Sequence, residues 1–156
     1  MSATPKAPLR LLTLSIAAVG IQALMLSPLL TDIASGLGTG PKEIGFAAAA
    51  YGVGVAASAL VAAPQLGHWQ KRQAIRSAFL LLTGALIVCG LAWSWHILAG
   101  GQLMAGLASG VIIPATYALT GDIAAPEQRS QAAGKVLFGW SVAMVAGVPL
   151  AALLSV

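Results

Sequence analysis

The sequence is poor in charge: charged residues make up 8% of its 156 residues, whereas hydrophobic residues make up 58%. An ordinary soluble domain carries about 25% charged residues. A soluble domain of this length leaves much of its surface in water, so its core cannot absorb this much apolar surface. The shortage of charge therefore excludes a typical soluble domain and indicates a chain whose main partner is the lipid bilayer.

Residues that hold metals or form covalent bonds are also scarce. Cys89 is the only cysteine, so no intrachain disulfide can form, and its apolar surroundings indicate a small buried residue. His68 and His96 fall on opposite sides of the expected membrane and cannot share a metal. The sequence shows no metal, nucleotide or nucleophile constellation, so we predict no cofactor, no metal site and no enzymatic activity.

Five apolar runs are long enough to cross a bilayer, since about 20 residues at 1.5 Å rise span its roughly 30 Å core. Residues 1–10 form a short polar arm before the first run, which is too long for the apolar core of a cleaved signal peptide. We predict an all-α membrane protein with five transmembrane helices and polar connections at 32–43, 67–76 and 122–135. The predicted spans are 11–31, 44–66, 77–95, 97–121 and 136–156.

The cations lie at the ends of the apolar runs and not on one amphipathic face, which argues against a nucleic-acid partner. If the N-terminal arm is cytoplasmic, the opposite side holds Lys42 alone. Cytoplasmic connections are enriched in Lys and Arg. We therefore expect a multi-pass protein of the inner (plasma) membrane with a cytoplasmic N-terminus. The expected cytoplasmic cations are Lys6, Arg10, Lys71, Arg72, Arg76, Arg129 and Lys135.

Small residues recur at every fourth position in three of the runs, which places each row along one helix face. Such rows let helix backbones approach closely in lipid, where no hydrophobic force drives helices together. We therefore predict a tightly packed bundle, bent where Pro114 and Pro149 remove backbone hydrogen bonds. The rows are Ala50, Gly54, Ser58, Ala62; Gln102, Gly106, Gly110, Pro114; and Gly139, Ala143, Gly147, Ala151.

The stretch Ala63–Arg72, APQLGHWQKR, resembles the loop motif between spans two and three of the major facilitator superfamily, roughly G-P-x-x-D-R-x-G-R-K. Pro64 and the pair Lys71 and Arg72 match that motif. Gly67 stands where the motif has aspartate, so one member of the usual charge network is replaced here.

Two further stretches resemble motifs of the same superfamily. Leu98–Gly106 is similar to the fourth-span motif L-x-x-x-R-x-x-x-G, with Gln102 in place of the arginine. Gly139, Gly147 and Pro149 resemble the glycine-proline motif in the fifth span of its drug:proton antiporters, the branch with arabinose-efflux-like members. The resemblance implies twelve helices in two halves with a solute path between them. This chain would be the N-terminal part, with a C-terminal half expected in addition.

The resemblance also implies a gate in which cations of the second connection pair with an acidic residue at the inner end of span four. Asp122 occupies that place, and Arg129 follows it in the next connection. The alternative is that Lys71, Arg72 and Arg76 act only as topology signals, which explains their sign and position.

Three polar residues are candidates for lining the path: Gln22, Asp32 and Gln102. Gln22 is the only large polar residue deep in the first run, and it faces either the path or a neighbouring helix. Asp32 is either a titrating group or a solvated helix end. Gln102 can form hydrogen bonds but cannot carry a proton charge. No carboxylate lies in the middle of a run, so a proton-coupling group would be Asp32 or lie in the expected C-terminal half.

The predicted function is secondary active transport, with proton-coupled efflux of a small solute or drug as the interpretation that the resemblance favours. The alternative is a non-transporting polytopic membrane subunit that pairs with another membrane protein. In that case the rows of small residues would form the partner interface.

Overall fold

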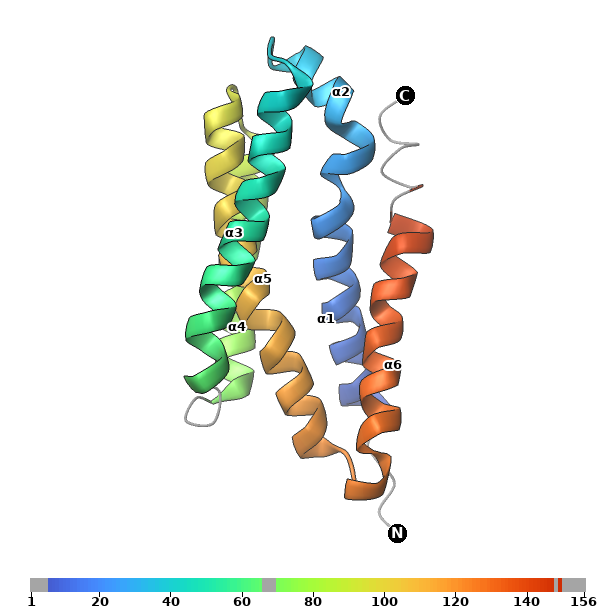
Figure 1. Cartoon of the computed structure of the whole chain (residues 1–156). Coiled ribbons are helices and arrows are strands. Elements are labelled where there is room, and N and C mark those ends of the chain that lie inside the picture. Colours follow the sequence, from blue (N-terminus) through green and yellow to red (C-terminus); the bar gives the residue numbers. More distant parts are fainter. Residues whose placement is uncertain (1–5, 66–69, 148, 150–156) are drawn as a thin grey trace.

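The computed structural model describes residues 6–65, 70–147 and 149, which form helices and short connections with no strand among them. Successive long helices run in opposite directions along the bundle (Figure 1). This confirms the predicted all-α architecture. The elements are α1 Lys6–Leu24, α2 Leu26–Gly36, α3 Pro41–Gln65, α4 Lys71–Gly90, α5 Trp95–Ile123, a 3₁₀ turn Pro126–Gln128, α6 Arg129–Val142 and a π-helical turn Ala143–Gly147.

Four of the described helices are long and apolar enough to cross a membrane, in α1, α3, α4 and α5. The qualifying stretches are Ala7–Leu24, Pro41–Ala62, Lys71–Gly90 and Trp95–Ile123. The predicted fifth run begins within α6 and continues through the π-helical turn. Beyond that turn only Pro149 belongs to the described residues.

The predicted first span is two helices and not one. α1 ends at Leu24 and α2 begins at Leu26. Pro28 supplies the physical reason, because its ring clashes with the carbonyl group four residues earlier, which is that of Leu24, and it has no N–H to donate. Hydropathy alone predicts one continuous run here, because proline does not interrupt the apolar pattern.

The predicted connection at 32–43 is also mostly helical, since α2 extends to Gly36 and α3 begins at Pro41. A Schellman motif ends α2, in which Thr39 N–H donates to the Ala34 carbonyl and Gly38 N–H to the Ser35 carbonyl. Gly38 has φ +61°, a left-handed conformation that glycine adopts without steric cost.

The basic connection at 67–76 is shorter than predicted, because α4 already begins at Lys71. Lys71, Arg72 and Arg76 therefore lie on the first turns of a helix and not in a loop. The connection at 122–135 is likewise largely helical, since α6 begins at Arg129. The end of an apolar run marks where lipid gives way to water, and a helix can continue past that boundary because its backbone hydrogen bonds are satisfied internally.

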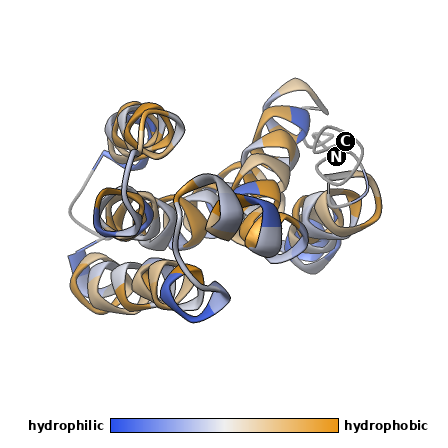
Figure 2. Cartoon of the chain, turned by 90° about the horizontal axis from the view of Figure 1, so that it is seen from above, coloured by the Kyte–Doolittle hydropathy of each residue, from blue (hydrophilic) through white to orange (hydrophobic). Residues whose placement is uncertain are grey.

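α5 lies at the centre of the packing and contacts α1, α3, α4 and α6. It changes direction in its second half (Figure 1), the half that contains Pro114. Viewed from above, apolar residues also colour the outward sides of the helices (Figure 2). Leu60, Leu80 and Val145 are each at least 76% exposed, as lipid-facing side chains are. The bundle is therefore apolar both inside and outside.

Glycines lie where helices approach closely, as the rows of small residues predicted. A Cβ added at Gly54 or Gly106 would collide with backbone atoms of the facing helix, α5 or α3 respectively. A Cβ at Gly139 on α6 would collide with the Thr13 carbonyl on α1. These contacts confirm the predicted tight packing and place α5 against α3, and α6 against α1.

Candidate functional site

Two glutamines meet in the interior between α1 and α5. The Gln22 Nε2 group donates a hydrogen bond of 3.2 Å to Gln102 Oε1. Gln22 is 5% exposed and Gln102 is 2% exposed. Gln22 Oε1 and Gln102 Nε2 have no hydrogen-bond partner in the described structure. The pair therefore holds one unpaired acceptor group and one unpaired donor group in a buried position, where each unpaired group raises the free energy.

Other polar residues continue along the same face of α5. Ser109 and Thr116 follow Gln102 at intervals of seven residues, or about two helical turns, and both are fully buried. Thr120 lies one turn further, and its Oγ1 donates to the Thr116 carbonyl at 2.8 Å. These three hydroxyls are not among the predicted site residues, although their helical spacing from Gln102 in an otherwise apolar run is a signal in the sequence.

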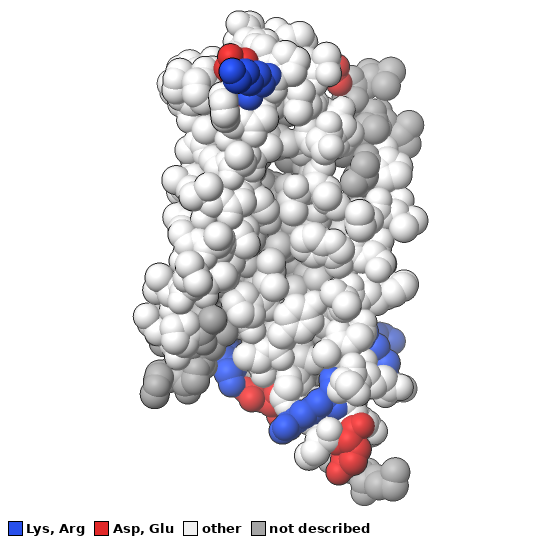
Figure 3. All heavy atoms as spheres, viewed as in Figure 1, with Lys and Arg blue, Asp and Glu red and all other residues white. Residues whose placement is uncertain are grey.

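An ion pair lies at the end of the bundle where most of the cations gather. Lys71 Nζ on the first turn of α4 lies 2.6 Å from Asp122 Oδ2 on the last turn of α5. Their side chains are 23% and 54% exposed, respectively, so water reaches both. Figure 3 shows basic and acidic side chains at this lower end of the molecule, with a long uncharged stretch above them. The structure thus brings together Lys71 and Asp122 from the candidate gate.

Other candidate gate residues take no part in an ion pair within the part of the chain that the structure describes. Pro64 is exposed near the end of α3, and Gly67 lies outside the described residues. Arg72 is exposed on α4, next to Lys71, and Arg129 is exposed at the start of α6. Among the described side chains, Lys71 is thus the one predicted cation that forms an ion pair with the Asp122 carboxylate.

Asp32, the third candidate for the path, is exposed on α2. It does not join the two buried glutamines, and its carbonyl oxygen accepts a hydrogen bond of 2.8 Å from the Ser35 hydroxyl. The structure therefore brings together two of the three predicted path residues and leaves the only carboxylate among them on the surface.

The glycine-proline motif lies on α6 and the turn that follows. Gly139 is buried against α1. Gly147 is the last residue of the π-helical turn, and Pro149 is exposed just beyond it. Proline cannot donate the backbone hydrogen bond that a regular α-helix requires, and π-helical turns also interrupt the α-helical pattern. The motif therefore begins at Gly139, where α6 packs closely on α1, and continues to Gly147, where the helix geometry changes.

Chemically, the interior differs from the lower end. The glutamine pair can donate and accept hydrogen bonds, but neither amide changes charge near neutral pH. It is thus suited to an uncharged polar group and unsuited to holding a proton. The ion pair at the lower end joins α4 to α5 through opposite charges in contact with water.

Comparison with known proteins identifies the family of this chain. The model of the Major Facilitator Superfamily matches residues 12–156. The uncharacterized MFS-type transporter YwfA of Bacillus subtilis is 27% identical over 139 residues, covering 89% of this chain and 34% of the relative. A chloramphenicol resistance protein of Streptomyces lividans is 29% identical over 147 residues, covering 94% of this chain and 38% of the relative.

A probable sugar efflux transporter of Mannheimia succiniciproducens is 29% identical over 122 residues, covering 78% of this chain and 31% of the relative. The chain thus spans about a third of the length of the curated relatives that it matches. The match of the family model extends over all four long apolar helices except the start of α1. This multi-pass membrane chain therefore belongs to the Major Facilitator Superfamily, whose members are transporters.

Proposed function

We propose that this chain forms part of a secondary active transporter, and not an enzyme, that exports a small solute using the proton gradient. The family match over 12–156, together with relatives named for efflux and for drug resistance, carries the proposal. Transport would proceed by rocking of two helix bundles around a central site. The relatives are about two and a half times as long as this chain, so we expect the second bundle to come from helices corresponding to their remaining length.

The interior chemistry supports an uncharged, hydrogen-bonding solute. Gln22 and Gln102 leave one acceptor and one donor unpaired, and a solute carrying hydroxyl or amide groups would satisfy both. Two relatives are named for chloramphenicol resistance and for sugar efflux. Chloramphenicol and sugars are both uncharged and rich in such groups. A charged solute would find no opposite charge at this pair and would lose its hydration.

The Lys71–Asp122 ion pair would act as the gate at the basic end of the path. It joins the start of α4 to the end of α5, and any opening that separates those ends must break it. Exposed ion pairs stabilise a protein by about 0–1 kcal/mol, so this contact can break and form again at little cost. In this proposal Pro64, Gly67, Arg72 and Arg129 belong to the same gate region, in which Lys71–Asp122 is the ion pair found among the described residues.

The proposal places the N-terminus in the cytoplasm of a cell whose inner, or plasma, membrane holds the protein. Lys42 lies at the start of α3 and Lys71 at the start of α4, and these two helix starts lie at opposite ends of the bundle (Figure 1). The excess of Lys and Arg in the segments near Lys71 agrees with a cytoplasmic end. Proton coupling would use Asp32 or a group beyond this chain, because Gln102 cannot titrate.

The test measures efflux by the protein encoded in the longest reading frame that contains this chain. Cells expressing it are loaded with labelled chloramphenicol or a labelled sugar, with and without a protonophore. We expect lower accumulation of at least one solute than in cells lacking the protein, and recovery of accumulation when the protonophore is added.

A Gly106→Leu variant, which disrupts the packing of α3 on α5, serves as the inactive control. Equal accumulation with and without the protein, combined with co-purification of another membrane protein, would favour the non-transporting subunit. Efflux that is unchanged by the protonophore would support a transporter and contradict proton coupling.

A further inference from the structure

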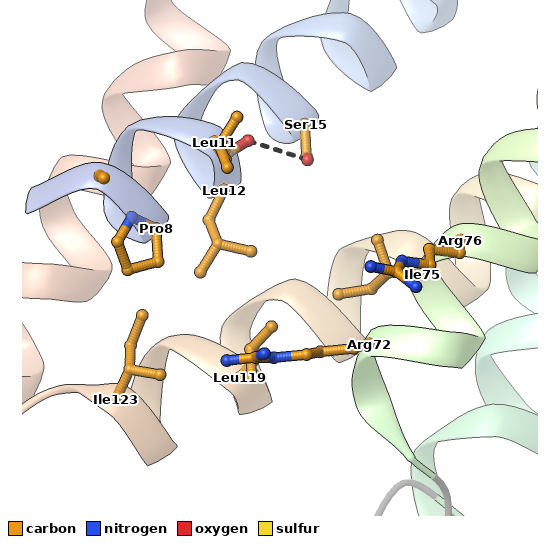
Figure 4. Close-up of a pocket in the computed structure, with 10 residues that line it drawn as sticks. Pro8, Leu11, Leu12, Ser15, Arg72, Ile75, Arg76, Leu119 and Ile123 are labelled. Carbon is orange, nitrogen blue, oxygen red and sulfur yellow. Dashed lines mark hydrogen bonds between the residues drawn. The ribbon is translucent and has the colours of Figure 1, made fainter. Parts of the chain in front are cut away.

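A hollow of about 390 Å³ lies at the basic end of the bundle, away from the glutamine pair. It opens between the start of α1, the first turns of α4 and the last turns of α5 (Figure 4). Its walls are mainly apolar, and its polar side chains are Ser15, Arg72 and Arg76. Figure 4 shows the side chains of both arginines on the α4 side of this hollow, facing Leu119 and α1. The apolar wall includes Pro8, Leu11, Leu12, Ile75, Leu119 and Ile123.

The two arginines are free to bind an anion. Arg72 and Arg76 lie four residues apart on α4, so both point from one helix face. Neither forms an ion pair with a described carboxylate, and Asp122, the carboxylate at this end of α5, is paired with Lys71. The Ser15 hydroxyl donates a hydrogen bond of 3.0 Å to the Leu11 carbonyl, so its O–H group does not donate to a ligand. The positive charge of the hollow therefore comes from two guanidinium groups, which bind phosphate oxygens through paired N–H donors.

We propose that this hollow binds one anionic phospholipid of the surrounding bilayer. The phosphodiester contacts Arg72 and Arg76, and an acyl chain lies along the apolar wall formed by Leu11, Leu119 and Ile123. A free phosphate would satisfy the arginines but leave that wall without an occupant. Basic pockets between transmembrane helices, at the level of the head groups, suit anionic lipids for the same reason.

The lipid would also connect helices that pack little on each other. α5 packs extensively with α4 and with α1, whereas α1 and α4 are not among the helix pairs in extensive contact. A lipid between Leu11 on α1 and Arg72 on α4 bridges these two helices at one end. Bound lipid is therefore expected to restrict the movement of α1 relative to α4.

The test uses the protein from the longest reading frame that contains this chain, purified in mild detergent and stripped of lipid. Phosphatidylglycerol and phosphatidylcholine of matched chains are added, and retained lipid is counted by native mass spectrometry. We expect one phosphatidylglycerol to be retained in preference to phosphatidylcholine. Arg72→Gln with Arg76→Gln should lower this retention about tenfold, because both phosphate ligands are lost.

The matched control is Arg129→Gln with Lys135→Gln, which removes two exposed cations near the same end that do not line the hollow. Its retention should stay within about twofold of the unaltered protein. Leu11→Trp supplies a second test, since it fills the apolar part without changing charge. It should also lower phosphatidylglycerol retention.

Three outcomes would overturn the proposal. An equal loss in both double variants would show general attraction to the basic end. Displacement of the lipid by millimolar inorganic phosphate or glycerol phosphate would identify a free anion as the ligand. Absence of any preferred lipid would indicate that another part of the longer protein covers the hollow.

Discussion

Gln22 and Gln102 meet where neither is more than 5% exposed, whereas Lys71 and Asp122 meet with 23% and 54% of their side chains exposed. Both contacts join residues far apart in the chain, and α5 carries one member of each. The buried contact is neutral and the exposed contact is charged. Transferring an ion out of water costs several kcal/mol, while a neutral amide costs less and keeps part of its hydrogen bonding.

The two contacts on α5 would therefore have different functions. Gln102 and Asp122 lie about 30 Å apart on α5, at 1.5 Å rise per residue. In the proposed transporter, the interior pair would meet the solute and the ion pair would control access at the end. Because α5 carries a member of the glutamine pair and a member of the ion pair, it would transmit a change at one pair to the other. The following variants test whether the two pairs have these separate functions.

The largest effect is expected from Gly106→Leu, one turn from Gln102. Its Cβ would collide with the backbone of Tyr51, so α3 and α5 must separate and the glutamine pair loses its support. Overpacking costs about 1–3 kcal/mol even where side chains can shift, and here the obstacle is backbone. The apparent melting temperature, followed by fluorescence-detected size exclusion, should fall sharply.

Gly100→Leu is the matched control, because a Cβ at Gly100 meets nothing within 4 Å. It lies on the same helix and receives the same side chain. If both variants lost the same stability, the close approach of α3 and α5 would not be the cause.

A smaller effect is expected from Gln102→Leu. The change leaves Gln22 buried without its partner, which costs about 1–3 kcal/mol. Replacing both glutamines by leucine should recover part of that loss, because no unpaired amide remains. Melting temperatures of the two single variants and the double variant measure the coupling. Solute efflux should fall in all three, and a double variant with normal efflux would separate the pair from the solute.

The smallest effect on stability is expected from Asp122→Asn, at most about 1 kcal/mol, because the ion pair is exposed. The proposed gate role predicts a larger change in efflux than in melting temperature. Combining Lys71→Asp with Asp122→Lys should restore efflux toward the unaltered level. A control change, Glu127→Gln, removes an exposed carboxylate with no described ion pair. Equal efflux in Asp122→Asn and the unaltered protein would remove the gate role.

Much of the membrane architecture could be predicted from the sequence. The length of the apolar runs, the scarcity of charge and the four-residue spacing of small residues are local properties of the chain. That spacing predicted the close packing of helices that is found at Gly54, Gly106 and Gly139. The helix ends were less predictable. α4 begins at Lys71, before the apolar run, because a helix can continue beyond the apolar residues. α1 ends at Leu24 because of Pro28, and the hydropathy of the run does not show this break.

The sequence by itself determined that this is a multi-pass, all-α membrane chain and which family's motifs it carries. Only the tertiary structure decided that Gln22 meets Gln102 and that Asp122 holds Lys71 while Arg72 and Arg76 line a separate hollow. Apolar length and the periodicity of small residues are local properties of the chain. The contacts between side chains depend on how the helices around α5 cross and rotate. Close glycine contacts between residues far apart in sequence determine this arrangement.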